Sequence, residues 1–384
     1  MSADWAAVEK AAKGQTVYFH AWGGAQTIND YIRWAADRLA ADHGVRLEHV
    51  KLDDTATAVS TVLAEKSAGR TEGGRVDLIW INGENFAAMQ RQNLLMGGEW
   101  AKKLPNYALA DTENIPTIET DFTVDTKGQE SPWGGAKLVF FHDSAGTKPA
   151  DLPTSFATLV DWTAENPGRF SYPAPPDFIG SSFLKQALSE TIAEPGKLLQ
   201  PVDEATFAAD TAPLFAALDA MHPNLWRSGR AFVKNYPAMV QGLADGELDI
   251  AFAFNPGEAS SAIAQGRLPE TVRSFTFPGG TLGNTHFVAI PFNANAKAAA
   301  LVTANFLLSP EAQARKQDPA VWGDPTVLAM GKLTDDDRKR FTALDLGVAT
   351  LPASDLGPVL PEPHPSWMSA IETEWAKRYG AGSN

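Results

Sequence analysis

Cysteine is absent from this chain of 384 residues. Without thiols, the protein has no disulfide bond, no thiolate metal site and no cysteine nucleophile. Long hydrophobic runs are absent too, so no segment of the sequence predicts a membrane-spanning helix. Basic residues are comparatively few, because 32 Lys and Arg stand against 46 Asp and Glu, a formal net charge of −14. This balance argues against nucleic acid and anionic membrane surfaces as partners, since both require clustered cations.

Motifs for metal binding and catalysis are also missing. The seven histidines are scattered, and no pair has the spacing of a zinc ligand set. No G-x-S-x-G nucleophile elbow, P-loop or G-x-G-x-x-G fingerprint stands between a strand and a helix. The sequence also contains no adjacent pair of tyrosines. We therefore expect no metal, no cofactor and no catalytic residue.

The length and composition predict a globular protein of two domains. A chain of 384 residues is too long for one ordinary core. Hydrophobic residues make up 44% of the sequence and charged residues 20%, which is an ordinary balance. The N-terminal sequence has no apolar core of a signal peptide, so the protein is either cytosolic or lacks a secretion signal that has been removed.

The first third of the sequence alternates between strand and helix patterns. The strands are "TVYFH", "VRLEHV" and "VDLIWI". Between and after them we expect helices over 27–41, from about Asp54 or Thr55 to near Gly69, and over 84–93. This order predicts a parallel sheet covered on both faces by helices, an α/β fold.

Ligands of such sheets bind beyond the carboxyl ends of the strands. The loops at those ends are residues 21–26, 53–57 and 82–85. We expect the binding residues of this part of the chain to lie there.

A second α/β pattern follows an irregular stretch over 104–135. It begins with the strand "AKLVFFHDS" and a helix over 156–165, and "RFSYPAP" and "LDIAFAFNPGEA" are predicted to pass from strand into loop. "THFVAIPF" is a further strand before a strong helix, and Ser309 is positioned to cap the next helix. The remainder is expected to be mainly helical.

Four of these segments resemble a known family. They are "VDLIWINGENFAAMQRQNLL", "SPWGGAKLVFFHDSA", "MVQGLADGELDIAFAFNPGEA" and "FVAIPFNANAKAAALVTANFLLSPEAQARK", of which the last is the most specific. Together they are similar to extracytoplasmic solute-binding proteins of ABC importers, the type II periplasmic binding proteins. Within that family the chain resembles the YnjB-like branch, itself similar to thiamine- and polyamine-type binders.

The resemblance implies an α/β fold of two lobes, with doubly wound sheets joined by crossover hinge strands. The implied parts are lobe one (1–135 and 280–308), lobe two (140–274 and 312–384) and hinges near 136–139, 275–279 and 308–311. Hinges need only a few residues that absorb backbone rotation. The resemblance also implies a periplasmic protein, most simply a monomer, whose signal peptide is absent from this sequence.

In lobe one, the first candidate site follows the first strand. Trp22 offers a flat face for stacking, and Gly23 and Gly24 let backbone amides approach a solute. The alternative is a packed tryptophan at the start of a helix.

Two further candidates belong to the same lobe. Asn82, Gly83, Glu84 and Asn85 supply amide groups and one carboxylate that can meet a cation, although Asn82 is also a typical helix cap. Trp133, beside the crossing strand, is either an aromatic wall of the site or part of the hinge packing.

In lobe two, "PAPPDFIGSSFLKQAL" combines a rigid approach with a flexible turn. Asp177 precedes Gly180, Ser181 and Ser182, which are predicted to begin a helix. Unpaired amides and two hydroxyls at that position can hold a carboxylate or phosphate. An ordinary helix cap is the alternative interpretation.

The other candidates of lobe two surround the strand "DIAFAF". Asn255 and Glu258 follow the strand at its carboxyl end, where we favour contact with the solute. Trp226 and Tyr236 precede it, and core packing explains them as well as ligand contact does.

These observations predict a binding protein without catalysis. The solute would contact both lobes, stabilise the closed form and be delivered to an ABC permease of the inner membrane. Glu84, Glu258 and several tryptophans favour a small cationic or zwitterionic molecule, for example a thiamine-like one. The alternatives are a carbohydrate-active enzyme or an oligosaccharide binder with an aromatic-lined cleft.

Overall fold

The computed structural model describes residues 2–352 and 355–380, and the chain divides into two units. Unit 1 comprises Met1–Gly135 and Thr285–Asp345, and unit 2 comprises Ala136–Asn284 and Leu346–Asn384. Two strands pass from one unit into the other, β6 (Glu130–Lys137) and β10 (Thr281–Ala289). Each unit is therefore built from two separate stretches of chain.

The third passage between the units differs from the sequence prediction. The sequence assigns residues 312–345 to lobe two, whereas they pack within unit 1, and the passage lies at Asp345–Leu346. The reason is the packing of the helix that follows Ser309. Its Ala312 carbonyl accepts a hydrogen bond from the Tyr31 hydroxyl (3.1 Å), and its Lys316 ammonium donates to the Trp133 carbonyl (2.8 Å). Residues 280–284, expected in lobe one, belong to unit 2.

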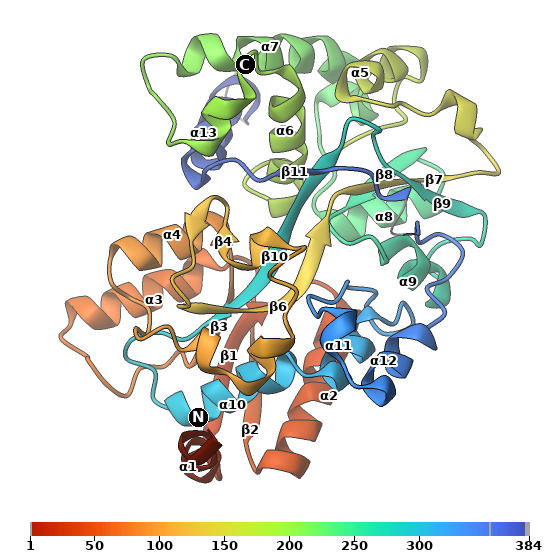
Figure 1. Ribbon diagram of the computed structural model, residues 1–384. Helices are drawn as coiled ribbons and strands as arrows, with labels where there is room; N and C mark the ends of the chain where they lie inside the picture. The colour runs from red at the N-terminus through yellow and green to blue at the C-terminus, as the bar shows by residue number, and fades with distance from the viewer. Residues whose placement is uncertain (1, 353–354, 381–384) are drawn as a thin grey trace. The chain divides into compact units, whose positions relative to one another are not determined.

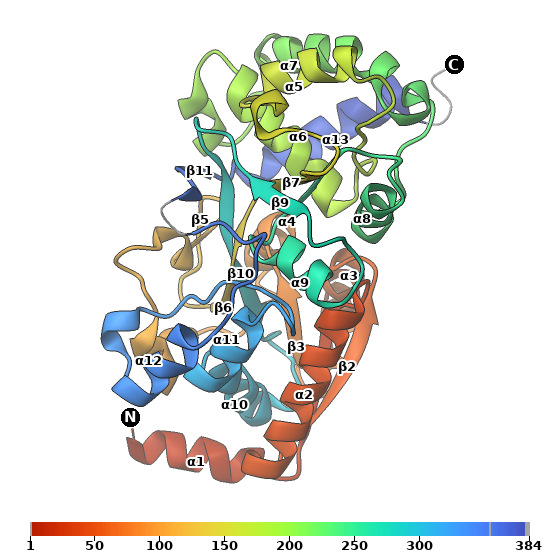
Figure 2. The same ribbon diagram turned by 90° about the vertical axis from the view of Figure 1, so that its right-hand side faces the viewer.

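Unit 1 is a sheet with helices on both faces. Its elements are α1 (Ser2–Ala12), β1 (Thr16–Trp22), α2 (Gln26–His43), β2 (Arg46–Leu52), α3 (Ala56–Ser67), β3 (Leu78–Ile81), α4 (Gly83–Arg91), η1 (Ala101–Lys103), η2 (Pro105–Leu109), η3 (Pro116–Ile118), β4 (Thr120–Asp121), β5 (Val124–Asp125), α10 (Lys297–Leu307), α11 (Pro310–Gln317), η8 (Met330–Lys332) and α12 (Asp335–Thr342). In Figures 1 and 2, α1 lies against α10, and α11 lies beside α12.

The sheet of unit 1 confirms the predicted parallel order. β1 pairs in parallel with β2 over its whole length and also with β3, while β10 joins β3 antiparallel. Alternate residues of β1 point into a core shared with α2 and α10. Ile79 and Ile81 of β3 point into a second core shared with α3 and α4. Because successive side chains of a strand point to opposite faces, these two cores cover the two faces of one sheet.

Unit 2 surrounds a smaller sheet. Its elements are β7 (Val139–Asp143), η4 (Pro149–Asp151), α5 (Phe156–Glu165), α6 (Phe178–Thr191), η5 (Pro195–Leu199), α7 (Phe207–Met221), η6 (His222–Asn224), η7 (Trp226–Gly229), α8 (Tyr236–Ala244), β8 (Ile250–Ala253), α9 (Glu258–Ala264), β9 (Val272–Phe275), β11 (Val359–Pro361) and α13 (Pro365–Tyr379). β7 pairs antiparallel with both β8 and β9, and α13 packs beside α6 (Figure 1).

Two sequence predictions of secondary structure were wrong. The segment "RFSYPAP" is not a strand, because the carbonyls of Arg169 and Phe170 accept hydrogen bonds from Asp249 and Trp226 in an irregular arrangement. The stretch predicted to be irregular over 104–135 contains the β4–β5 hairpin and the start of β6. A proline and two glycines within β6 hide its strand pattern.

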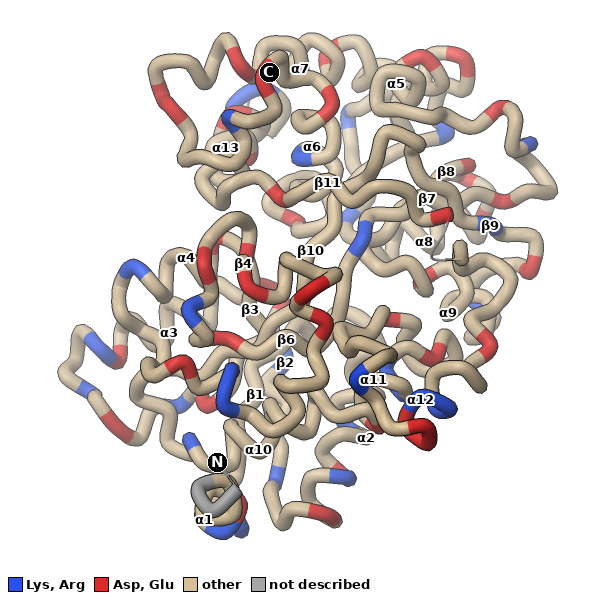
Figure 3. The backbone as a smooth tube through the Cα atoms, viewed as in Figure 1, with Lys and Arg blue, Asp and Glu red and all other residues tan. Residues whose placement is uncertain are grey.

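No helix in the described part of the chain has the length and apolar character needed to cross a bilayer. Charged residues of both signs are spread along the chain, and α12 shows them together (Figure 3). Acidic residues occupy the first turn of α12 and basic residues its last turn, which matches the direction of the helix dipole.

Candidate functional site

The predicted site residues of unit 1 lie at one edge of its sheet. Parallel pairing places the carboxyl end of β1 beside that of β2, with Trp22 opposite Leu52, and β3 runs parallel on the other side of β1. The loops that follow β1 and β3 therefore leave the sheet at the same edge, as the sequence predicts.

Gly23 and Gly24 have structural reasons to be glycine. The Gly23 amide donates to the Leu52 carbonyl (3.0 Å), and the Gly23 carbonyl accepts from the Asn29 side chain (3.0 Å). A side chain at Gly23 would collide with Lys51, and one at Gly24 would collide with the Trp22 indole. The Gly23 amide is therefore already used within the protein, and the half-buried Trp22 ring is the group at this loop with a face for a solute.

The start of α4 is held by a residue that sequence reasoning missed. Both carboxylate oxygens of Asp121 accept the Gly83 amide (2.9 Å each), and Gly83 has a left-handed backbone (φ 60°) under the Phe122 ring. Asn82 occupies the N-cap position of α4 as the helix-cap interpretation predicts, but its side chain makes no capping hydrogen bond. Asp121 lies 38 residues beyond Gly83 in a short hairpin, and no local sequence pattern marks it.

Glu84 and Asn85 stand in the first turn of α4. The Asn85 side-chain amide donates to the Glu84 carboxylate (3.2 Å), and both side chains are only partly buried. An anionic side chain at the start of a helix is stabilised by the helix dipole. Glu84 is thus a carboxylate at the carboxyl end of β3 in unit 1.

Trp133 lies in the core of unit 1. It is fully buried and packs against Phe19, Trp80 and Trp322, with ring centroids 5.9, 5.1 and 5.6 Å away. The Lys316 ammonium stands 4.0 Å from the Trp133 ring centroid and 4.3 Å from that of Trp322. An internal cation therefore occupies the aromatic face that the sequence offers to a solute, which favours the packing interpretation of Trp133.

Lys316 and Asp324 form a buried ion pair beside these rings. Burial lowers the pKa of Lys316 to about 8, although the charge of Asp324 acts in the opposite direction. Lys316 and the neighbouring His286 hold the pKa of the Asp324 carboxyl below its usual range despite its burial. Lysine at 316 and aspartate at 324 belong to no motif, so no local pattern in the sequence marks the pair.

In unit 2, α6 begins two residues earlier than predicted. Asp177 is its N-cap, and its carboxylate accepts the amides of Ile179 (3.0 Å) and Gly180 (3.3 Å). Burial raises the pKa of Asp177, an effect that the two amides oppose. The Asp177 carboxylate thus already accepts the Gly180 amide, and the Asp177 carbonyl accepts the Ser181 amide (2.9 Å), so neither amide is left for an anionic solute group.

Ser181 and Ser182 are also committed to contacts within unit 2. The Ser181 hydroxyl donates to Glu372 of α13, and the Ser182 hydroxyl donates to the Phe178 carbonyl (2.7 Å). Both serines are fully buried. The prediction that these residues start the helix was wrong, because Asp177, three residues before Gly180, is the N-cap.

The structure brings Tyr236, Asn255 and Glu258 together after β8. Asn255 accepts the Gly257 amide on its side-chain oxygen (3.0 Å), and its carbonyl accepts the Glu258 amide (3.1 Å). Arg267, which sequence reasoning missed, pairs with the Glu258 carboxylate (3.4 Å). Burial, followed by the charge of Glu258, raises the pKa of Tyr236 well above its ordinary value.

Aromatic packing joins this cluster to the start of α6. The rings of Phe178 and Phe254 meet edge to face, with centroids 5.8 Å apart. Asp177 precedes Phe178, and Asn255 follows Phe254. The carboxylates and aromatic rings of unit 2 are thus contributed by two neighbouring loops.

Trp226 has other partners. Its indole donates to Glu247 (3.0 Å), and the Arg227 guanidinium lies 4.0 Å from its ring centroid. These contacts explain Trp226 by packing at the surface of unit 2, with part of its ring against the core.

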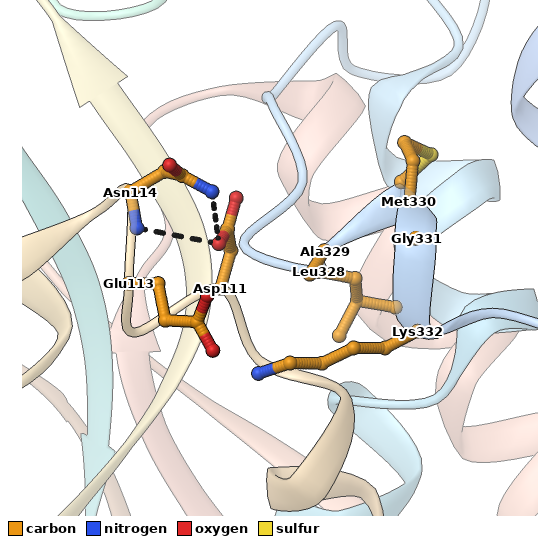
Figure 4. A pocket seen from close by; sticks show the side chains of 8 residues that line it. All are labelled: Asp111, Glu113, Asn114, Leu328, Ala329, Met330, Gly331 and Lys332. Carbon is orange, nitrogen blue, oxygen red and sulfur yellow. Dashed lines mark hydrogen bonds between the residues drawn. The ribbon is translucent and has the colours of Figure 1, made fainter.

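One cavity of unit 1, about 580 Å³ in volume, lies away from the predicted residues (Figure 4). Asp111, Asn114 and Lys332 are among the residues that line it, and the Asp111 carboxylate accepts from both the backbone and the side chain of Asn114. In the described part of the chain, no group of three His, Asp or Glu is arranged to hold a metal ion.

Comparison with known proteins places the chain in a family. The sequence model of the bacterial extracellular solute-binding proteins matches residues 34–329. The protein YnjB of Escherichia coli is 47% identical over 380 residues, which covers 99% of this chain and 95% of YnjB.

Solved structures show the same fold at low sequence identity. The periplasmic binding protein AfuA of Actinobacillus pleuropneumoniae has a TM-score of 0.65 at 14% identity and covers 96% of this chain and 99% of its own. The polyamine-transporter binding protein PotD of Streptococcus pneumoniae has a TM-score of 0.63 at 15% identity, with 95% and 98% covered. The protein is thus a bacterial solute-binding protein. It belongs to the bacterial extracellular solute-binding protein family.

Proposed function

We propose that the protein captures a small organic cation or zwitterion in the periplasm for an inner-membrane ABC permease. The observation that carries this proposal is the Glu258 cluster of unit 2. Glu258 is only 9% exposed and interacts with the buried Tyr236, and it follows by four residues Phe254, whose ring packs on Phe178. A carboxylate among aromatic rings suits an ammonium or a cationic heteroaromatic ring, through charge pairing and cation–π contact.

The partner of Glu258 supports a zwitterion. Arg267 meets Glu258 through a single contact of 3.4 Å, longer than a good charge-assisted hydrogen bond. A solute ammonium at Glu258 would leave Arg267 available to a carboxylate or phosphate of the same solute. Arg267 therefore replaces the α6 amides as the proposed partner of an anionic group of the solute.

Trp22 and Glu84 of unit 1 enter the same proposal. Trp22 retains a half-buried ring and Glu84 a partly buried carboxylate, both at the carboxyl edge of the sheet. These are the residue types that add stacking and charge to the recognition of a heteroaromatic cation. A thiamine-like molecule has both features.

Relatives of this fold bind chemically different solutes. PotD of Streptococcus pneumoniae is described as a spermidine/putrescine binding protein, AfuA was solved with fructose-6-phosphate, and HitA of Pseudomonas aeruginosa was solved with iron. The fold therefore does not define the solute, and the proposal depends on the side chains of this chain.

The test is a binding screen on protein that has been unfolded and refolded to remove any carried-over ligand. Thiamine, spermidine, putrescine and glycine betaine are compared with maltose and glucose by thermal shift, and any hit is then measured by calorimetry. Ligands that bind only the native state raise the melting temperature. We expect a cationic hit whose Kd rises about tenfold or more in Glu258→Gln, because a charge-assisted contact is lost.

The matched control is Glu270→Gln, an exposed carboxylate of unit 2, which should leave the Kd unchanged. Glu84→Gln and Trp22→Ala examine the contribution of unit 1 in the same way. Stabilisation by sugars alone, or full affinity in Glu258→Gln, would overturn the proposal.

A further inference from the structure

Unit 2 contains a second cavity that includes none of the residues discussed as solute contacts. Its volume is about 910 Å³. It lies between the loops around η6 and η7 and the end of α13, whose course Figure 2 shows. Its lining includes aromatic and basic residues, among them His222, Arg230, Phe232, Lys234, Trp375 and Tyr379.

One wall of this cavity is aromatic. The rings of Phe232 and Trp375 meet with centroids 5.1 Å apart, and Trp375 meets Tyr379 at 5.7 Å. The imidazole of His222 packs edge to face on Tyr379, with centroids 4.3 Å apart. Phe232 and Tyr379 are partly exposed and offer their rings to a flat ligand, while the buried rings of Trp375 and His222 pack against them.

A hydrogen-bond relay fixes the protonation of His222. The Trp375 indole donates to the Tyr172 hydroxyl (2.9 Å), and that hydroxyl lies 2.7 Å from Nε2 of His222. Tyr172 is fully buried, and donating its own proton to Nε2 is the arrangement that leaves neither group unsatisfied. Nε2 is then the acceptor, and the imidazole carries its proton on Nδ1.

His222 therefore presents a neutral N–H donor at a residue that lines the cavity. Burial lowers the pKa of His222 to about 4, although the charge of Asp219 opposes this effect. The side chain is only 8% exposed, and its Nε2 is engaged by the Tyr172 hydroxyl. The Nδ1 proton is therefore the group with which His222 can meet an acceptor on a ligand in the cavity.

The opening of the cavity is basic. Arg230 and Lys234 are exposed and form no ion pair with any described residue, whereas Arg378 is held by Glu374 (2.7 Å). Among the described residues that line the cavity, Asp219 is the one carboxylate, and it accepts the Tyr379 hydroxyl (2.6 Å). The available charges are thus positive.

We propose that this cavity is a second binding site, for a flat aromatic carboxylate. The ring would pack on Phe232, Trp375 and Tyr379, and the carboxylate would accept the His222 Nδ1 proton and meet Arg230 and Lys234. The site takes an anion without a cationic group, whereas the solute proposed above carries one, and it shares no residue with the Glu258 cluster. It therefore stands or fails independently of that proposal.

The experiment uses 1-naphthoate as probe and 1-naphthamide, its uncharged analogue, as the matched ligand. Calorimetry on the full chain should show saturable binding of 1-naphthoate and about tenfold weaker binding of the amide, because the charge-assisted contacts are lost. His222→Phe keeps the ring and removes the donor, and we expect it to raise the Kd for 1-naphthoate about tenfold.

A second variant guards against misfolding, because Arg230→Gln with Lys234→Gln changes only exposed side chains. This double variant should raise the Kd for 1-naphthoate and reduce the salt dependence of its binding. Lys377→Gln, a cation of α13 that does not line the cavity, is the control. The site is refuted if 1-naphthoate does not saturate at millimolar concentration, if the Arg230/Lys234 variant binds it normally, or if Glu258→Gln abolishes its binding.

Discussion

At the scale of single residues, Glu130 has the surroundings least suited to its charge. It is 1% exposed, and neither carboxylate oxygen has a hydrogen-bond partner among the described residues. Burial, together with the negative charge of Asp121, raises the pKa of Glu130 well above its ordinary value. The folded protein therefore keeps a proton on Glu130 that the unfolded chain releases above its usual pKa.

Glu130→Gln should stabilise the protein at neutral pH. Because the folded pKa is raised, wild-type stability falls as pH increases above about 4.3, and a tenfold change in proton affinity corresponds to about 1.4 kcal/mol. The glutamine variant lacks this loss, so we expect its unfolding free energy at pH 7 to exceed that of wild type by more than about 1 kcal/mol. Urea denaturation at several pH values measures the difference, which should vanish near pH 4.

Exposed Glu72→Gln should show no such pH-dependent gain. Equal stability of wild type and Glu130→Gln at every pH would contradict a protonated Glu130.

At the scale of elements, β6 depends on a close approach to the Lys316–Asp324 ion pair. A methyl group added at Gly134 would clash with the Lys316 nitrogen and an Asp324 oxygen, and both of these side chains are fully buried. At neighbouring Gly135 the nearest atom, the Pro325 carbonyl oxygen, would lie 3.6 Å away, an ordinary contact. Two adjacent glycines of one strand therefore have different tolerance for a side chain.

Gly134→Ala should destabilise the protein by about 3 kcal/mol, because the methyl group forces a buried ion pair apart. Gly135→Ala should cost less than about 1 kcal/mol, since substitutions that create no clash have small effects. Urea denaturation compares the two variants with wild type. Similar stability of both variants would show that the ion pair can move aside.

Elements with local signals were predictable, and those without them were not. The α5 bounds of Phe156–Glu165 match the prediction because Ser155 forms a capping box at its start. Ser309 caps α11 as predicted, with its hydroxyl accepting the Ala312 amide (3.2 Å). β6 has no such local signal. Its pairing partner, β10, lies far along the chain, and the two glycines of β6 are typical of a turn.

The candidate site followed the same rule. Loops at strand ends, such as the one with Asn255 and Glu258, could be found because topology places them. Their partners Asp121 and Arg267 could not be predicted, because their contacts with Gly83 and Glu258 follow no local spacing in the sequence. The Gly180 amide predicted to bind an anion instead donates to the nearby Asp177 carboxylate.

At the scale of the whole molecule, unit 2 depends on the C-terminal helix. α13 contributes Trp367, Ile371 and Trp375 to its core, each no more than 3% exposed. Glu362, just before α13, binds Lys185 of α6 (2.6 Å) and Asn284 of β10 (2.9 Å). The middle of the chain therefore lacks part of its own core until the C-terminal segment has packed onto it.

A chain ending at residue 361 should leave unit 2 unfolded while unit 1 remains folded. Burial of each large apolar side chain contributes about 2 kcal/mol, so the loss of three, together with the Glu362 contacts, is comparable to the margin of about 5 to 15 kcal/mol by which an ordinary domain is stable. Hydrogen exchange followed by mass spectrometry should show lost protection over 136–284 and retained protection over 1–135. Retained protection in both stretches would refute the dependence.

The cluster of Trp80, Trp133 and Trp322 gives unit 1 an optical signature. Its indole rings lie edge to face with centroids 5.1 to 5.7 Å apart, close enough for their electronic transitions to couple. Coupled indoles produce an exciton couplet in the circular dichroism spectrum, and the couplet disappears when the rings separate. Because the three rings belong to unit 1, the couplet reports the melting of that unit separately from the helical signal of the whole chain.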